Sequence, residues 1–411
     1  MKIAGIIAEY NPFHNGHALH IAMTRRNTGC SHLVAAMSGH FVQRGEAAIF
    51  DKWSRAEMAV RGGADLIIEL PCIVSVRSAQ YFATGGVRLL AALGATYLSF
   101  GAEQADLTEL GKAAYAVDDP LFGQIFTRHI TEGVTYAKAL AATISEQTGL
   151  TEQLVGAPNN ILAIEYLRAI KKWAPAIAPV AIPRMEAEYH DPVIQGTIAS
   201  ATAIRLAMIT EIRLSEKIRQ AVPFATYEKV AQLLDDRKGP ITHSSFEAIM
   251  LAKLRSTPLI TLENLPDVTE GLHHKIATAS LHATNMEHFF TLLQSKRYPR
   301  TRLQRIVIHA LLGTTKNDLA KHDATGPLYA RILAFNDKGR ELLRHYRGAC
   351  PLLLKTTSLL SSKQRNSATL TAAQKMLALD TQATDLFTLA MPGHHWRYGG
   401  WDFLRSPVYV K

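Results

Sequence analysis

The first twenty residues constrain the fold of this chain more than any other segment. An apolar run, Ile3 to Ala8, predicts a fully buried strand of a parallel sheet. The turn signal Asn11-Pro12 follows, and His14-Asn15-Gly16-His17 stands at the expected start of a helix. Such a strand, turn and helix N-terminus bring two imidazoles and backbone N–H groups to one place, where a phosphate chain would bind. We expect Gly16 to let a nucleotide lie flat on the backbone.

Two other interpretations of the histidines are open. In the first, one imidazole caps the turn and the other is solvated. In the second, His14, His17 and His20 share a helical face and bind a metal ion. No carboxylate or cysteine stands nearby to complete a zinc site. The sequence therefore favours nucleotide binding, and we expect no metal site.

Composition indicates a globular, basic protein. The 411 residues favour two domains, and 47% hydrophobic with 19% charged residues excludes a disordered chain. No apolar stretch is long enough to cross a membrane, and three scattered cysteines favour a reducing, cytoplasmic location. The net charge of +10 makes a polyanion such as RNA the first candidate partner.

Strand-like and helix-like segments alternate over the first hundred residues. Residues 33–37, 64–70 and 96–100 predict further strands with helical segments between them, and residues 180–184 predict another. This order is typical of an α/β fold with a Rossmann-like, doubly wound parallel sheet, whose ligands bind beyond the carboxyl ends of the strands. Strand signals largely vanish after about residue 220.

We therefore expect a boundary between two domains at about residue 215. We predict that residues 1–215 form a catalytic domain around the parallel sheet. We predict that residues 216–411 form a mainly α-helical domain.

A second motif, Ser200-Ala201-Thr202-Ala203-Ile204-Arg205, precedes an amphipathic helical segment. Its hydroxyl groups, helix N–H groups and guanidinium suit an oxyanion cluster, although a Ser N-cap with a solvated Arg is a simpler explanation. With His14-x-Gly16-His17, it resembles the nucleotidyltransferase superfamily, whose enzymes activate substrates at the α-phosphate of ATP. In that superfamily the second motif has another Ser where this chain has Ala201.

The segment Met37 to Glu46 is polar for a loop after a buried strand, and Lys52 and Arg55 follow it. One interpretation makes it a second wall of the substrate site. The other makes it a turn followed by a solvated basic helix face.

Further motifs make the resemblance specific to one family within this superfamily. The matching segments are Glu9 to His17, Met37 to Glu46, Pro158 to Leu162, Tyr189-His190-Asp191 and Lys296 to Arg305. Together and in this order they resemble the bacterial tRNA(Met) cytidine acetate ligase family. The resemblance implies ATP-dependent acetylation of N4 of the wobble cytidine, at position 34, in elongator tRNA(Met). It implies acetate as the acyl donor, not acetyl-CoA, and ATP with Mg²⁺.

The resemblance also implies the site residues. His14 and His17 would stabilise charge on the α-phosphate, with Ser200 and Arg205 holding the pyrophosphate. The implied nucleotide-binding residues are Ile7, Ala8, Glu9, Tyr10, Asn11, Pro12, Phe13, His14, Asn15, Gly16, His17, Ala18, Leu19, His20, Gly101, Asn159 and Arg184. Whether Asn159 or its neighbour Asn160 faces the nucleotide is open at this point.

Residues 296 to 305 interleave cations with an aromatic ring. Thr301 is expected to cap a helix on which Arg302 and Arg305 share a face, with Lys296 and Arg297 just upstream. Phosphate neutralisation and stacking on a ring are common ways to bind unpaired RNA bases. A solvated basic helix face is the alternative for this segment alone.

Two rival functions make different predictions. A cofactor-forming adenylyltransferase would act on a small phosphorylated substrate and show no salt-sensitive tRNA binding. A catalytically inactive relative would bind tRNA without releasing pyrophosphate.

Overall fold

A computed structural model describes residues 1–131, 134–184, 194, 196–211 and 214–411. Tyr189, His190 and Asp191, which contributed to the family resemblance, lie outside these described residues. Within the described residues, no helix is long and apolar enough to cross a membrane.

One eight-stranded sheet organises the molecule, with the strand order β5-β4-β1-β2-β3-β6-β7 and with β8 paired to β6. The strands from β5 to β3 are all parallel, and β6 is antiparallel to β3. The strands are β1 (Ile3–Ala8), β2 (His32–Ser38), β3 (Leu66–Leu70), β4 (Tyr97–Ala102), β5 (Ala178–Pro183), β6 (Ala330–Phe335), β7 (Leu352–Leu353) and β8 (Val408–Tyr409).

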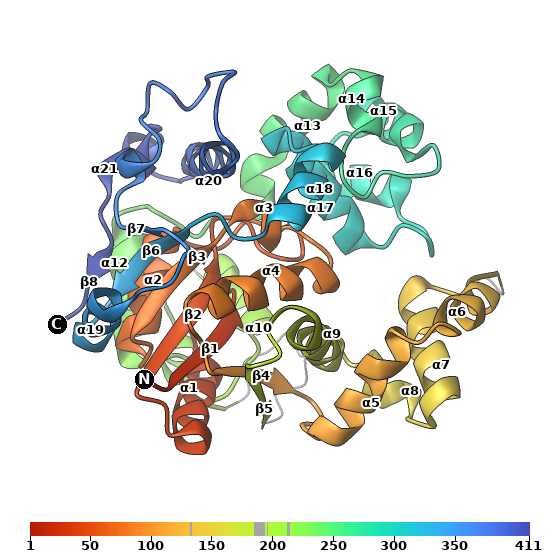
Figure 1. Ribbon diagram of the computed structural model, residues 1–411. Helices are drawn as coiled ribbons and strands as arrows, with labels where there is room; N and C mark the ends of the chain where they lie inside the picture. Colours follow the sequence, from red (N-terminus) through yellow and green to blue (C-terminus); the bar gives the residue numbers. More distant parts are fainter. Residues whose placement is uncertain (132–133, 185–193, 195, 212–213) are drawn as a thin grey trace.

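Helices cover both faces of this sheet (Figure 1). Those before residue 215 are α1 (Asn15–Thr28), α2 (Lys52–Arg61), α3 (Cys72–Ser75), α4 (Ala79–Ala92), α5 (Leu107–Val117), α6 (Phe122–Thr131), α7 (Tyr136–Thr148), α8 (Glu152–Gly156), α9 (Pro158–Trp173) and α10 (Ala201–Thr210). Those after it are α11 (Glu216–Ala221), α12 (Phe224–Asp235), α13 (Glu247–Ser256), α14 (Leu259–Glu263), α15 (Leu272–His282), α16 (Met286–Leu293), α17 (Arg300–Leu312), α18 (Lys316–Thr325), α19 (Asp337–His345), α20 (Ala372–Leu389) and α21 (Trp401–Leu404).

Successive side chains of β2 point to opposite faces of the sheet, and both faces are covered by helices. Leu33, Ala35 and Met37 pack into the core that includes α1, α2 and α12. Val34 and Ala36 point to the opposite face and pack into the core that includes α4, α5 and α9. Because both faces are apolar and buried, the strand is a continuous apolar run, as in other doubly wound sheets.

The predicted fold class is confirmed, with one addition at the edge of the sheet. All five predicted strands are present in the parallel part. The strands β6, β7 and β8 were not predicted; they come from residues 330–409 and extend the same sheet. The half beyond residue 215 is mainly helical but not separate from the sheet, so the boundary at 215 stays a prediction.

A buried ionic cluster connects the C-terminal part of the chain to the parallel part of the sheet. The Nζ atom of Lys52 lies 2.7 Å from a carboxylate oxygen of Glu69 and 2.8 Å from one of Asp402. Arg331 on β6 pairs with the same two carboxylates. Burial disfavours the charged form of Asp402, but Arg331 and Lys52 outweigh it and lower its pKa. Two cations and two anions therefore neutralise each other in the interior of the protein.

The interpretation of Lys52 and Arg55 as a solvated basic helix face is wrong. Both side chains are fully buried, so α2 presents no solvated basic face at these positions. The Arg55 guanidinium donates to the carbonyl oxygens of Phe50, Glu9, Ser38 and Gly39, which fixes the backbone after β1 and β2. These two cations support the carboxyl edge of the sheet from inside.

We predict that Asp402→Asn lowers the free energy of unfolding by about 3 kcal/mol, because it leaves two buried cations facing one carboxylate. Urea denaturation measures the change. Asp235→Asn, at an exposed position on α12, is the matched control and should have little effect. Equal stability of the two variants would contradict a structural role for the cluster.

Candidate active site

The site begins where β1 ends and α1 starts. His14 is the N-cap of α1, and its Nδ1 accepts a hydrogen bond from the Gly16 N–H at 3.1 Å. The Nδ1 of His17 accepts in turn from the His14 N–H at 3.3 Å. The two imidazole rings are stacked with centroids 3.7 Å apart. The histidines therefore cap the helix reciprocally and fix each other's orientation.

The structure gives Gly16 a different role from the one predicted. A Cβ atom at this position would lie 2.9 Å from Cε1 of the His14 ring. A side chain there would displace the capping imidazole. Glycine at position 16 therefore leaves room for the His14 ring, and its role toward a nucleotide stays a prediction.

Two aromatic rings support the second imidazole. The Tyr10 ring packs edge-on against His17 with centroids 4.9 Å apart, and the Phe13 ring lies 5.6 Å from His17. Tyr10 and Phe13 are themselves buried and contact each other. The imidazoles thus rest on a rigid apolar base.

The histidines are neutral at physiological pH. Burial, followed by the nearby Arg184 and Arg205, lowers the pKa of His14 to about 3. Burial, followed by His14 and Arg184, lowers the pKa of His17 well below its usual value. A neutral imidazole carries one ring proton, and both Nδ1 atoms accept hydrogen bonds. Each ring therefore carries its proton on Nε2, where it is a hydrogen-bond donor.

His20 occupies a separate position. Its Nε2 lies 2.9 Å from Oγ of Ser99 on β4, and burial lowers its pKa to about 4. Within the described part of the chain, no group of three or more His, Cys, Asp or Glu side chains is arranged to hold a metal ion.

The second motif meets the first one directly. The Arg205 guanidinium, on α10, donates to the backbone carbonyl of Asn11 at 2.9 Å and to the Thr202 hydroxyl at 3.2 Å. Ser200 is the N-cap of α10, and its hydroxyl accepts from the Ala203 N–H at 3.0 Å. Residues nearly 200 positions apart therefore form one site, with a second helix N-terminus beside the first.

A third group of residues completes the site beyond β4 and β5. Arg184 donates to the Asn159 side-chain oxygen at 2.9 Å, and the Asn159 amide donates to Glu103 at 2.6 Å. A Cβ atom on Gly101 would lie 3.3 Å from the Arg184 side chain. Because Arg184 lowers the pKa of all three histidines of α1, this group lies within electrostatic reach of them.

The geometry distinguishes the two adjacent asparagines. Asn160 is buried, and its side chain bonds to the Leu154 carbonyl and the Gln104 N–H. Asn159 is partly exposed and contacts Arg184. Of the two, Asn159 therefore has the more accessible side chain. The anchoring role of Glu103 was not predicted, although its position just after the fourth strand and Gly101 was a signal.

The loop from Met37 to Glu46 is fixed against this site. The Gln43 N–H donates to the Glu9 carboxylate at 3.0 Å, and burial raises the pKa of Glu9. His40 is buried, with its ring nitrogens close to the Lys52 N–H and the Thr384 hydroxyl. The part of the loop nearest Glu9 adjoins the site, and His40 belongs to the interior.

The four predicted RNA-binding residues have different environments. Lys296 and Arg297 are exposed, and Arg297 pairs with Glu270 on the surface. Arg302 donates to the Asp267 carbonyl at 2.8 Å, and Arg305, 9% exposed, pairs with the Asp267 carboxylate at 3.1 Å. The latter two guanidinium groups hold the loop at residues 267–270 against α17.

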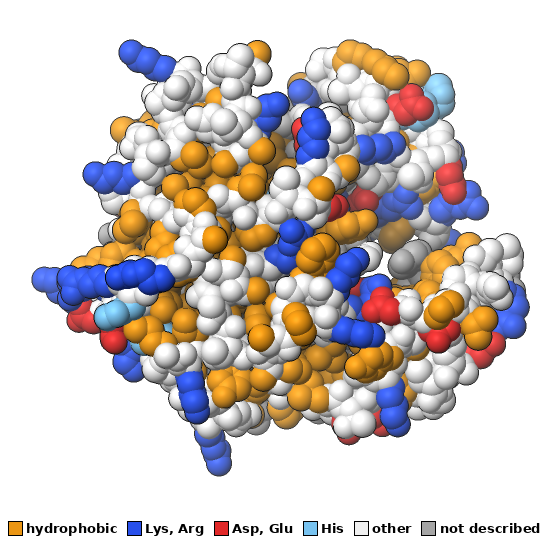
Figure 2. Space-filling model, viewed as in Figure 1, with side chains coloured by type: hydrophobic (Ala, Val, Ile, Leu, Met, Phe, Trp, Pro, Cys, Tyr) orange, Lys and Arg blue, Asp and Glu red, His pale blue; other side chains and the backbone are white. Residues whose placement is uncertain are grey.

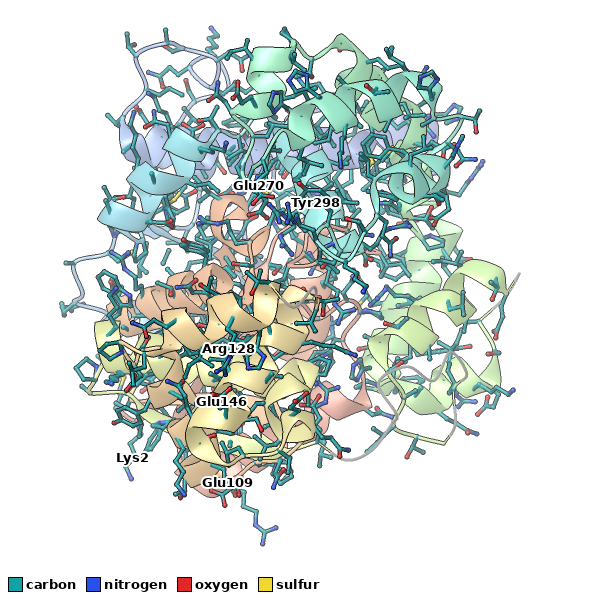
Figure 3. All side chains as sticks on the ribbon, turned by 90° about the vertical axis from the view of Figure 1, so that its right-hand side faces the viewer. Lys2, Glu109, Arg128, Glu146, Glu270 and Tyr298 are labelled. Carbon is teal, nitrogen blue, oxygen red and sulfur yellow. The ribbon has the colours of Figure 1, made fainter. Side chains whose placement is uncertain are left out.

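Helix α17 also begins differently from the prediction. It starts at Arg300 with Pro299 at the N-cap, so Thr301 is not the cap. Figure 3 shows Glu270 and Tyr298 near each other at this loop, where Arg302 lies over the Tyr298 ring. The interleaved cations and ring therefore stabilise a loop–helix contact.

A family model described as HIGH Nucleotidyl Transferase matches residues 1–398, which include the whole site. The match agrees with the parallel sheet, the histidine motif at the N-terminus of α1 and the converging arginines. The chain belongs to this family of HIGH nucleotidyl transferases.

Its full-length relatives within the family carry a more particular name. A protein of Thermoanaerobacter sp. (strain X514) is named tRNA(Met) cytidine acetate ligase and is 39% identical, covering 99% of this chain and 100% of the relative. A relative with the same name from Syntrophomonas wolfei is 35% identical, covering 99% of each chain.

Solved structures agree with this relationship. The apo form of Thermotoga maritima TmcAL has a TM-score of 0.91 at 29% identity, covering 100% of both chains. The same protein bound with alpha-thio ATP has a TM-score of 0.88 at 28% identity, again over 100% of both.

We predict that the His14→Asn variant loses less stability in mild acid than the native protein does. In the native protein, His14 stays neutral down to a pKa of about 3, while the unfolded chain takes up its proton below about pH 6.5. The free energy of unfolding therefore falls as the pH falls below 6.5. Asn keeps a capping acceptor but does not titrate.

Urea denaturation at pH 7 and pH 5 checks this prediction. The variant should lose about 2 kcal/mol less than the native protein between these two values. An identical pH dependence in both proteins would show that His14 is accessible to protons in the folded state.

Proposed function

We propose that this protein is an ATP- and acetate-dependent ligase that acetylates N4 of the wobble cytidine, at position 34, of elongator tRNA(Met), in the cytoplasm. The observation that carries the proposal is the convergence of two neutral, stacked imidazoles and two arginines at the N-terminus of α1. In this arrangement the histidines offer hydrogen-bond donors to a phosphate chain, and the arginines offer positive charge. The histidines themselves are uncharged.

The chemistry proceeds in two steps. Acetate is unreactive toward an amine because its leaving group would be oxide. Attack of an acetate oxygen on the α-phosphorus of ATP forms acetyl-adenylate and releases pyrophosphate. The cytidine N4 then attacks the acetyl carbonyl carbon, AMP leaves, and N4 loses a proton to form N4-acetylcytidine.

We assign the residues to roles in the first step. The Nε2–H groups of His14 and His17 donate to oxygens of the α-phosphate as charge develops there. Arg205 and the helix N-terminus at Ser200 hold the leaving pyrophosphate. The remaining residues of Ile7 to His20 surround the nucleotide.

Arg184, Asn159 and Gly101 form the nucleoside side of the site. Asn159 offers both a donor and an acceptor to a base or ribose edge. Mg²⁺ is proposed only as the counterion of the triphosphate. The described side chains offer no cluster of three or more metal ligands for it, and no step is assigned to it.

The RNA substrate is proposed to bind through the basic part of the C-terminal half. Lys296 and Arg297 are exposed and available to phosphates, while Arg302 and Arg305 hold their loop in shape. We therefore assign direct RNA contact to the first pair and a positioning role to the second.

We predict that His17→Ala abolishes acetate-dependent ATP–pyrophosphate exchange, because it removes an Nε2–H donor and the ring stacked on His14. The affinity for tRNA should be nearly unchanged. The control is His345→Ala, at an exposed position on α19. Exchange that survives in His17→Ala would remove this histidine from the reaction, and exchange that requires no acetate would favour a cofactor-forming adenylyltransferase.

We predict that Lys296→Ala combined with Arg297→Ala weakens tRNA binding and flattens its salt dependence, with pyrophosphate exchange unchanged. Filter binding at several salt concentrations measures both quantities. Arg302→Ala combined with Arg305→Ala is the contrasting variant and should lower the thermal stability of the protein. An unchanged salt slope in the first variant would place the RNA elsewhere.

A further inference from the structure

A pocket separate from the proposed active site lies between α18 and α20, over α3. Its volume is about 650 Å³, within the range that holds a ligand of nucleotide size. Figure 2 shows hydrophobic side chains at the surface between the parts of the molecule that carry α20 and α18, with Lys and Arg side chains around them. None of the residues assigned to adenylation lines this pocket.

Part of the pocket lining is apolar, and the rest is polar or charged. Leu312 and Met376 are buried at its base, and Leu370 and Leu379 are partly exposed along its sides. Apolar side chains of this kind can pack against the face of a planar, unstacked base. The pocket therefore suits a group with a large apolar surface.

Three cations and two carboxylates line the pocket, so the cations outnumber the anions by one. The Asp318 carboxylate accepts from the Thr315 N–H at 2.9 Å and from its hydroxyl at 2.6 Å, where it caps α18. The Asp385 carboxylate pairs with Arg365. Lys321 and Lys375 are exposed and make no ion pair with any described residue. Two ammonium groups therefore remain available to an anion beside the apolar part of the lining.

The pocket opens near the edge of the sheet that carries the proposed active site. Helix α3, which forms its floor at Ile73, directly follows the carboxyl end of β3. The histidine motif follows the carboxyl end of β1, which is two strands away in the sheet. At the usual strand spacing, that separation is about 10 Å along the edge. The pocket therefore lies at the end of a strand whose carboxyl end is on the same edge of the sheet as the histidine motif.

We propose that this pocket binds one unstacked nucleotide of the RNA substrate, other than the nucleotide that is acetylated. Its base packs against the apolar part of the lining, and its phosphates are met by Lys321 and Lys375. The proposal rests on the proposed function for the identity of the RNA. An uncharged metabolite would contact the apolar part of the lining but would give the two ammonium groups no anionic partner. A nucleotide therefore fits the lining better.

The first test removes the two ammonium groups. Lys321→Ala combined with Lys375→Ala should weaken binding of an elongator tRNA(Met) transcript and reduce the magnitude of the slope of log affinity against log salt by about 1.4, because each contact to single-stranded phosphate contributes about 0.7. Lys338→Ala, at an exposed position on α19 beyond the opposite edge of the sheet, is the matched control. An unchanged affinity in the double variant overturns the proposal.

The second test fills the pocket and leaves its charges in place. Ala378→Leu adds volume to a partly buried position of the lining and should reduce tRNA affinity about tenfold with no change in the salt slope. Loss of affinity in the lysine variant alone would mean surface phosphate contact without insertion of a base, and would overturn the proposal.

A third measurement separates this proposal from the proposed function. Acetate-dependent ATP–pyrophosphate exchange without tRNA should be the same in all of these variants as in the native protein, which also shows that they fold. If the native protein binds tRNA through this pocket but forms no N4-acetylcytidine, the proposed function fails and the pocket assignment stands.

Discussion

The site depends on one hydrogen bond, from the Gly16 N–H to Nδ1 of His14. It caps α1, sets the ring proton of His14 on Nε2, and places this ring against His17. A Cβ atom at position 16 would lie 2.9 Å from this ring and force it to shift. Burial keeps both imidazoles uncharged, so the site offers directed donors, and the positive charge comes from Arg184 and Arg205. A phosphate chain would therefore meet fixed donors that need no reorganisation when charge develops.

The carboxyl edge of the sheet is held from within by the ionic cluster of Lys52, Glu69, Arg331 and Asp402. This cluster joins α2 and β3 to β6 and α21, which are more than 250 residues later in the chain. The edge that carries the histidine motif and the helices proposed to bind RNA are thereby parts of one connected structure. Helix α20, which lines part of the pocket, is joined to the chain after β3 by the Asp380 carboxylate, which accepts from the Cys72 N–H at 2.8 Å.

Local pattern predicted the parallel strands and the position of both motifs at helix starts, because apolar runs and turn signals are properties of neighbouring residues. It missed β6, whose residues Ala330–Phe335 pair with a strand about 260 positions earlier, and that pairing leaves no local signal. For the same reason Lys52 and Arg55 suggested a solvated face: their partners arrive only through the tertiary fold. The spacing of Arg302 and Arg305 was interpreted as an RNA surface, whereas Asp267 occupies both guanidinium groups.

In the proposed reaction, acetate itself is activated by ATP at the histidine motif and transferred to a cytidine of tRNA. Incubation of the purified protein with ATP, acetate and tRNA, followed by mass spectrometry of the digested nucleosides, tests it most directly. We predict N4-acetylcytidine when acetate and ATP are both present, and none when either is omitted or when acetyl-CoA replaces them. Formation of N4-acetylcytidine from acetyl-CoA without ATP, or no product from ATP and acetate, would contradict the account.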